Sequence, residues 1–114
     1  MLTVYTLKNC DTCKKAIKWL EAEGISFQNH DVRADGLTRD TIASIVTTLG
    51  WETALNRRST TWRNLDEADK ADTDNEKAVR LIEAHPTLLK RPVFVQGEKI
   101  VTGFNDAAKA LADG

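Results

Sequence analysis

This sequence of 114 residues contains few of the residues on which disulfide-rich, proline-rich or metal-binding folds depend. It has two cysteines, two prolines and two histidines, and its formal net charge at pH 7 is -1. The two cysteines are Cys10 and Cys13, and a bridge between them would close too short a loop to stabilise the fold appreciably. These numbers exclude a disulfide scaffold. The near-neutral charge gives no general attraction to nucleic acid or to an anionic membrane.

Long apolar segments are also absent. No run approaches the ~20 residues that a transmembrane helix requires, and the opening residues MLTVYTLKNC lack the basic leader of a secretory signal. We therefore expect a cytoplasmic protein without a membrane partner. In that reducing compartment, neighbouring cysteines indicate catalysis, redox sensing or metal binding more often than a structural bridge. The length predicts a single domain over residues 1–114, and we expect a monomer.

The hydrophobic pattern at the two ends of the chain predicts the element order β-α-β and then β-β-α. The first part contains strands at 2–7 and 25–32 with a helix at 12–23 between them. The second part contains a hairpin within 91–104 and a closing helix at 105–114. The residues expected to bound these elements are Gly24, Gly97 and either Asn105 or Asp106. This order is that of an α/β, thioredoxin-like mixed sheet.

A helical segment of about residues 37–90 is inserted between the two parts. Amphipathic helices are expected at 37–49 and at 74–85, whereas residues 55–68 are predicted to be irregular. The residues expected to start or stop these helices are Thr38, Gly50 and Pro86.

The cysteine pair is placed for thiol chemistry. Cys10 is expected at the junction of the first strand and helix, where unpaired N–H groups and the helix dipole favour a thiolate, and Lys8 and Lys14 add positive charge. Cys13 follows one turn later on the same face, and from there it could attack a mixed disulfide formed on Cys10. A C-x-x-C beside a βαβ pattern is typical of thioredoxin-like redox motifs. The alternative is that Cys13 is a small buried hydrophobic residue.

Zinc binding is the main chemical rival. A zinc site would need two further ligands, and the only imidazoles, His30 and His85, lie far apart in the sequence. No second C-x-x-C is present. We therefore expect no metal and no bound cofactor.

Three segments occur in order along nearly the whole chain: YTLKNCDTCKKAIKWLEAEGI, GWETALNRRSTTWRNLDEAD and the pair Arg91-Pro92. Together they resemble the arsenate reductase (ArsC)/Spx family, most closely its small YffB-like branch. The resemblance implies a thioredoxin-like fold with an inserted helical subdomain, which agrees with the element order described above.

The resemblance also implies roles for individual residues. Cys10 corresponds to the nucleophile of the family, and its anion-facing arginines correspond to Arg91 and to Arg58, which is favoured over Arg57. Arginine is suited to this role because it grips an oxyanion or carboxylate through two parallel hydrogen bonds. The alternative for either arginine is a solvated surface charge. We expect the catalytic residues to be Cys10, Cys13, Arg58 and Arg91, and the substrate-binding residues to be Asn9, Lys14, Arg57 and Pro92.

The Arg91–Pro92 peptide bond precedes the short run VFV. In a thioredoxin-like site the backbone at this junction faces the nucleophile. We predict that the bond is cis, a form accessible at modest cost only before proline.

Two departures from the family bear on the activity. Glutaredoxin-linked arsenate reductases carry a third arginine after the last strand, where this chain reads VTGFNDAAK. Many YffB-like and arsenate-reducing relatives also lack a cysteine at the position of Cys13, whereas Spx-type regulators have C-x-x-C. The first departure weakens an arsenate site, and the second favours a dithiol or a redox switch.

We expect a cytoplasmic thiol-dependent reductase in which Cys10 attacks and Cys13 or glutathione resolves the intermediate. The resemblance implies glutathione as co-substrate, a small anionic or disulfide substrate, and glutaredoxin as a partner. The alternatives are an Spx-like redox-sensing regulator that binds RNA polymerase and a true arsenate reductase. Spx-type chains extend beyond the final helix, whereas this sequence ends at LADG, so the enzyme is favoured over the regulator.

Overall fold

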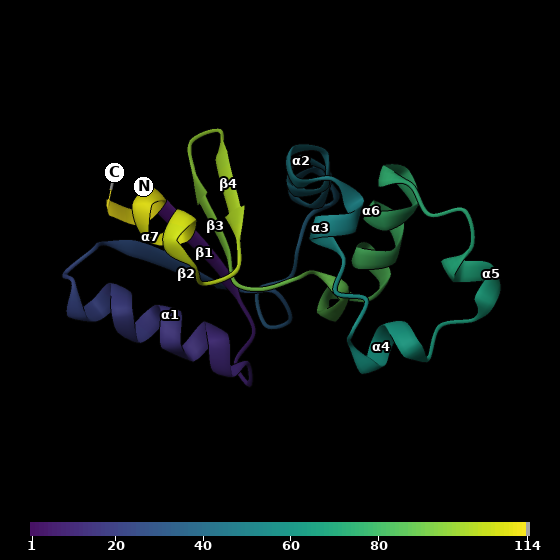
Figure 1. Ribbon diagram of the computed structural model, residues 1–114, viewed down its shortest axis with the longest axis horizontal. Helices are drawn as coiled ribbons and strands as arrows, with labels where there is room; N and C mark the ends of the chain where they lie inside the picture. Colours follow the sequence, from purple (N-terminus) through teal and green to yellow (C-terminus); the bar gives the residue numbers. More distant parts are fainter. Residues whose placement is uncertain (114) are drawn as a thin grey trace. The chain divides into compact units, whose positions relative to one another are not determined.

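The computed structural model describes residues 1–113, and the chain divides into two compact units (Figure 1). Unit 1 comprises Met1–Asp35 and Arg91–Gly114, and unit 2 comprises Gly36–Lys90. Among residues 1–113, no helix has the length and apolar character needed to cross a bilayer.

Unit 1 is built around a mixed four-stranded sheet. Its strands run in the order β2-β1-β3-β4, with β1 parallel to β2 and antiparallel to β3, and β3 antiparallel to β4. Two helices accompany the sheet (Figure 1). The elements are β1 (Leu2–Thr6), α1 (Asp11–Ala22), β2 (Phe27–Asp31), β3 (Val93–Gln96), β4 (Lys99–Thr102) and α7 (Asp106–Asp113). This is the thioredoxin-like fold that the element order predicted.

The end of α1 shows why β2 is shorter than the predicted strand at 25–32. Gly24 has φ +67°, and its N–H donates to the Glu21 carbonyl at 3.2 Å. The Ile25 N–H donates to the Leu20 carbonyl at 3.0 Å, so Ile25 completes a Schellman cap and does not belong to the strand. Pairing with β1 begins at Phe27.

The other predicted boundaries in unit 1 are confirmed. Gly97 has φ +63° in the turn between β3 and β4. Asn105 starts α7, because its Oδ1 accepts the Ala108 N–H at 2.9 Å. Residue 114 of the predicted closing helix lies outside the described residues.

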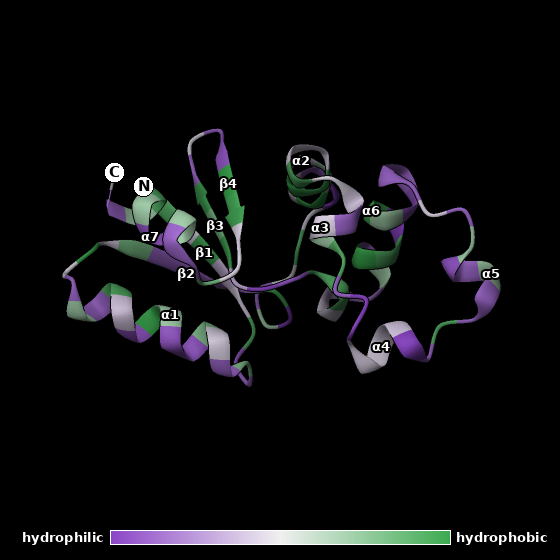
Figure 2. Cartoon of the chain, viewed as in Figure 1, coloured by the Kyte–Doolittle hydropathy of each residue, from purple (hydrophilic) through white to green (hydrophobic). Residues whose placement is uncertain are grey.

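The core of unit 1 lies on one face of its sheet. Leu2 and Val4 point to the same face because side chains alternate along a strand, and Phe94 lies opposite Val4 on β3. Both helices bury small or aliphatic side chains against these residues, namely Ala16, Leu20, Ala108 and Ala112. In Figure 2, β1 and β3 are largely hydrophobic, whereas α1 alternates between hydrophobic and hydrophilic residues.

Unit 2 is helical. Its elements are α2 (Arg39–Leu49), α3 (Trp51–Ala54), α4 (Thr60–Arg63), α5 (Glu67–Lys70), α6 (Asn75–Ala84) and the 3₁₀ turn η1 (Pro86–Leu88). The two predicted amphipathic helices correspond to α2 and α6. The predicted start and stop of α2 are confirmed, since the Thr38 hydroxyl accepts the Thr41 N–H at 3.2 Å and Gly50 follows the last turn.

The prediction that residues 55–68 are irregular was wrong in part. This stretch contains α4 and the start of α5. The Ser59 hydroxyl caps α4 by accepting the Trp62 N–H at 3.2 Å. Helices of a single turn are too short to show an apolar period, so only the cap could have indicated them. The segment around α5 is mostly hydrophilic (Figure 2).

Candidate active site

Cys10 is the N-cap residue of α1. Its backbone is extended, with φ -97° and ψ 117°, and its N–H donates to the Leu7 carbonyl at 3.1 Å. Its half-buried Sγ accepts the Cys13 backbone N–H at 3.4 Å. The sulfur therefore lies where the first N–H groups of a 12-residue helix are available to stabilise negative charge. The predicted position at the strand–helix junction is confirmed.

Cys13 differs sharply from Cys10 in its surroundings. Its side chain is 1% exposed and its thiol is free. Burial raises the pKa of Cys13 to about 12, and the hydrogen bond to Cys10 and the Cys10 charge act in the same direction. The Leu7 backbone and the charge of Arg91 oppose this rise. Cys13 therefore keeps its proton near neutral pH and donates a hydrogen bond to the Cys10 sulfur.

The Arg91–Pro92 bond is cis, as predicted. Pro92 is buried, and its carbonyl accepts the Gly103 N–H at 2.8 Å. Arg91 is half-buried.

The register of the sheet places the Arg91–Pro92 bond near the end of β1, the strand that leads to the cysteines. Tyr5 on β1 lies opposite Val93 on β3. Continuing the antiparallel register by one position sets Pro92 beside Thr6, at the end of the strand that leads to Cys10. Arg91 follows one position further, and its charge acts on Cys13.

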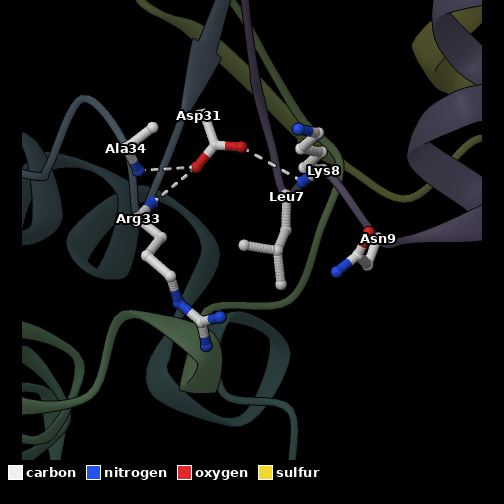
Figure 3. A pocket seen from close by; sticks show the side chains of 6 residues that line it. All are labelled: Leu7, Lys8, Asn9, Asp31, Arg33 and Ala34. Atoms are coloured by element: carbon white, nitrogen blue, oxygen red, sulfur yellow. Dashed lines mark hydrogen bonds between the residues drawn. The ribbon is translucent and has the colours of Figure 1, made fainter.

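Asp31 holds the backbone just before Cys10, a role that the sequence analysis missed. Its Oδ2 accepts the Lys8 N–H at 3.1 Å, and its Oδ1 accepts the N–H groups of Arg33 and Ala34, each at 2.8 Å. Figure 3 shows these three hydrogen bonds. The Ala34 N–H, followed by those of Arg33 and Lys8, holds the pKa of Asp31 below its usual range, and the Arg33 charge adds to this. The available signal was an Asp directly at a strand end, where its side chain commonly bonds nearby backbone.

The predicted site residues fall into two groups. Unit 1 contains Cys10, Cys13, Arg91 and Pro92, together with the exposed Asn9 and Lys14. Asn9 immediately precedes Cys10, and the Lys14 N–H donates to the Cys10 carbonyl at 3.0 Å. Arg57 and Arg58 belong to unit 2.

The two arginines of unit 2 have different local contacts. They line a hollow of about 650 Å³ whose other lining residues are Glu52, Leu55, Asn56, Trp62 and Lys90. The Arg57 guanidinium lies over the Trp51 ring, 5.4 Å from its centroid. The Arg58 backbone N–H donates to the Asn56 Oδ1 at 3.2 Å. Both arginines are exposed, and the Arg57 guanidinium is engaged by an aromatic ring.

Residues 5–110 match the model of the ArsC family. The chain belongs to the ArsC family. Among curated proteins, an uncharacterized protein of Haemophilus influenzae is 47% identical over 106 residues, which cover 93% of each chain. The global transcriptional regulator Spx of Streptococcus mutans is 31% identical over 108 residues, covering 93% of this chain and 78% of the regulator.

Solved structures agree with this ArsC-family assignment. The structure described as YFFB (PA3664) protein superposes with a TM-score of 0.92 at 42% identity, covering 98% of each chain. An arsenate reductase-related protein of Brucella melitensis gives a TM-score of 0.77 at 41% identity, covering 95% of this chain and 90% of that one. These relatives support either a thiol-reductase type of role or an Spx-like role for this ArsC-family chain. Within residues 1–113, no group of three His, Cys, Asp or Glu side chains is arranged to hold a metal ion.

Proposed function

We propose that this ArsC-family chain is a cytoplasmic thiol-dependent reductase that acts on disulfides and uses glutathione as its reductant. The observation that carries the proposal is the Cys10 Sγ at the N-cap of α1, where it accepts the Cys13 N–H at 3.4 Å and lies beside a protonated Cys13 thiol. Hydrogen bonds and a helix N-terminus stabilise a thiolate more than a thiol, and the thiolate is the nucleophile.

The first step is attack of the Cys10 thiolate on one sulfur of a disulfide substrate. A Cys10–S–S–R bond forms, the substrate S–S bond breaks, and the other half leaves as a thiolate that takes a proton from water. Cys10 is oxidised and the released thiol is reduced. The positive charge of Arg91 lowers the pKa of Cys13, and it also favours binding of an anionic substrate near the two cysteines.

The second step is resolution of the mixed disulfide. Once Cys10 is bonded to R, its negative charge and its acceptor role are gone, and both had raised the pKa of Cys13. Cys13 then loses its proton more readily, attacks the Cys10 sulfur and releases RSH, which leaves a Cys10–Cys13 disulfide. Two glutathione molecules reduce this disulfide and become glutathione disulfide. The competing route omits Cys13, and glutathione attacks the mixed disulfide directly.

Two serine variants test the proposal. Cys10→Ser is expected to abolish reduction of a glutathione mixed disulfide, because it removes the nucleophile. Cys13→Ser is expected to leave activity that depends wholly on added glutathione, or to accumulate a mixed disulfide on Cys10 that is visible by intact mass. Full activity in Cys10→Ser would contradict the reductase assignment.

Mass spectrometry of the mildly oxidised protein separates the two resolving routes. A loss of two hydrogens within one chain supports the Cys10–Cys13 disulfide. Glutathionylated Cys10 beside a free Cys13 thiol would instead support the monothiol route. Including arsenate in the substrate panel tests the arsenate reductase alternative. Phe104, in the stretch where relatives carry a third arginine, packs against Trp19 with ring centroids 5.9 Å apart, so it supplies no anion ligand.

A second candidate function is an Spx-like regulator. It is favoured by the 31% identity to the S. mutans regulator and by the adjacent thiols Cys10 and Cys13. A pull-down with the carboxy-terminal domain of the RNA polymerase α-subunit tests it. Capture by the reduced and oxidised chain to different extents would support the regulator, and no capture in either state would favour the enzyme.

A further inference from the structure

A hollow of about 360 Å³ lies beside the turn that delivers Cys10. It is lined by three consecutive residues of that turn and three from the end of β2 and the loop that follows, namely Leu7, Lys8, Asn9, Asp31, Arg33 and Ala34. All six belong to unit 1. Figure 3 shows the Leu7 and Arg33 side chains extending in the same direction, away from the Asp31 carboxylate.

The lining of this hollow carries a net positive charge, because it has two cations, Lys8 and Arg33, and one acid, Asp31. Both carboxylate oxygens of Asp31 already accept backbone N–H groups from Lys8, Arg33 and Ala34. The two cations, Lys8 and Arg33, are exposed and lie within ion-pair distance of no carboxylate among residues 1–113, although the Arg33 charge acts on Asp31. A site with two available cations beside Leu7 and Ala34 suits a ligand with a carboxylate on a short apolar stem.

The hollow is within reach of a group bonded to Cys10. The Cys10 N–H donates to the Leu7 carbonyl at 3.1 Å, which closes a turn over Lys8 and Asn9. The ends of such a turn lie within ~7 Å of each other. One extended residue spans about 3.5 Å. In a tripeptide thiol bonded to Cys10 through its own cysteine, the residue after that cysteine and its terminal carboxylate therefore extend over a distance comparable to the width of this turn.

We propose that this hollow is the subsite for a carboxylate of glutathione bonded to Cys10, with Arg33 and Lys8 as its binding residues. The inference rests on the proposed function for the identity of the ligand. Asp31 contributes by holding the Lys8 and Arg33 backbone in place. The subsite would make the enzyme prefer glutathione disulfides over neutral disulfides.

Binding of S-methylglutathione, which cannot form a disulfide, tests the subsite independently of turnover. Amide resonances of residues 7–9 and 31–34 are expected to shift on titration. Arg33→Gln and Lys8→Gln are each expected to raise the Kd at least about threefold, as expected for loss of one exposed charge pair. Arg80→Gln, which removes an exposed arginine of α6, is the matched control and should bind like the parent chain.

Two outcomes would overturn the subsite: no amide shift at residues 7–9 and 31–34, or equal Kd values in Arg33→Gln, Lys8→Gln and Arg80→Gln. Reaction of Cys10 with bis(2-hydroxyethyl) disulfide, which has no carboxylate, separates this result from the reductase proposal. If the neutral disulfide reacts but S-methylglutathione does not bind, the subsite is wrong and the reductase stands. If S-methylglutathione binds in the hollow but neither disulfide reacts, the subsite stands and the reductase proposal is wrong.

Discussion

Cys10 and Cys13 lie one helical turn apart but have different chemistry because of where their sulfurs lie. The Cys10 sulfur is half-buried at the helix start and accepts an N–H group. Cys13 is 1% exposed, and its thiol is hydrogen-bonded to Cys10. The same spacing that permits a disulfide therefore also places the two thiols in different surroundings, one at the helix start and accessible, the other buried and protonated.

Alkylation with iodoacetamide is expected to modify one thiol of the native protein and spare the other. At about pH 8, close to the value of a free thiol, Cys10 should react because it is accessible. Cys13 should resist, because its pKa is raised to about 12 and its side chain is buried. Peptide mapping identifies the site, and the unfolded chain, in which both thiols react, is the control. Equal labelling of both thiols in the native chain would contradict the assigned roles.

Several features of individual residues were predictable from the sequence, because they depend only on neighbouring residues. The N-cap position of Cys10 and the cap at Thr38 follow from short stretches of sequence. The burial of Cys13 beneath Cys10 left two interpretations open in the sequence, since a buried thiol and a resolving thiol occupy the same i+3 position. The bonds of Asp31 to the nearby N–H groups of Arg33 and Ala34 could have been predicted from its place at a strand end. Its bond to the Lys8 N–H could not, because it joins residues 23 apart in the chain.

At the scale of elements, Asp31 connects the end of β2 to the turn between β1 and α1. Asp31→Ala removes three hydrogen bonds to backbone N–H groups. We expect it to lower the free energy of unfolding by about 1 kcal/mol, as for loss of a capping side chain. It should also slow the reaction of Cys10 with both neutral and anionic disulfides, because it loosens the turn before Cys10. The anionic disulfide should be slowed more, because Asp31 also holds the backbone of Lys8 and Arg33.

The pH dependence of the stability tests whether the negative charge of Asp31 causes this stabilisation. The pKa of Asp31 is lower in the folded state than the ordinary value of 3.8. The stabilisation is therefore complete above pH 3.8 and is lost as the pH falls through the folded value. In urea unfolding, the difference between the parent chain and Asp31→Asn should be present near neutral pH and shrink in acid. Glu98→Gln, an exposed position of the β3–β4 turn, is the control and should show no such trend.

The longer helices, which repeat their apolar residues over several turns, were predicted to within two residues of their observed boundaries, and the short helices were not predicted. The helices α1, α2 and α6 have 10 to 12 residues each and show a clear apolar face. The helices α3, α4 and α5 have four residues each, and hydrogen bonds such as that of Ser59 with the Trp62 N–H define them. Tertiary and capping bonds, rather than periodicity, set the structure of that part of unit 2.

At the scale of the whole molecule, the predicted site residues are divided between the two units of the chain. Unit 1 contains the cysteines, Arg91 and Pro92, and unit 2 contains Arg57 and Arg58. The sequence could not decide between the adjacent arginines by spacing alone, because either side chain could be solvated. Their contacts within unit 2 now separate them, since Arg57 lies over Trp51.

The family resemblance assigns an anion-facing role to Arg58, and paired substitutions test it against Arg57. Arg57→Ala removes a cation–π contact with Trp51, so it should lower the free energy of unfolding by about 0.5–1 kcal/mol and leave kcat/KM nearly unchanged. Arg58→Ala should leave stability nearly unchanged. It should lower kcat/KM for glutathione mixed disulfides about tenfold or more, because a charged hydrogen-bond pair contributes about 1.5–3 kcal/mol.

The neutral substrate bis(2-hydroxyethyl) disulfide supplies the control for this pair of arginines. This substrate has no carboxylate for an arginine to bind, so the Arg58→Ala variant should reduce it at the rate of the parent chain. Arg58→Lys keeps the charge but loses the planar two-point geometry, so it should restore only part of the activity toward the anionic substrate. If Arg57→Ala showed the selective loss and Arg58→Ala did not, the assignment of the two arginines would have to be exchanged. Equal losses on both substrates would show that the arginine supports the fold of unit 2 rather than the substrate.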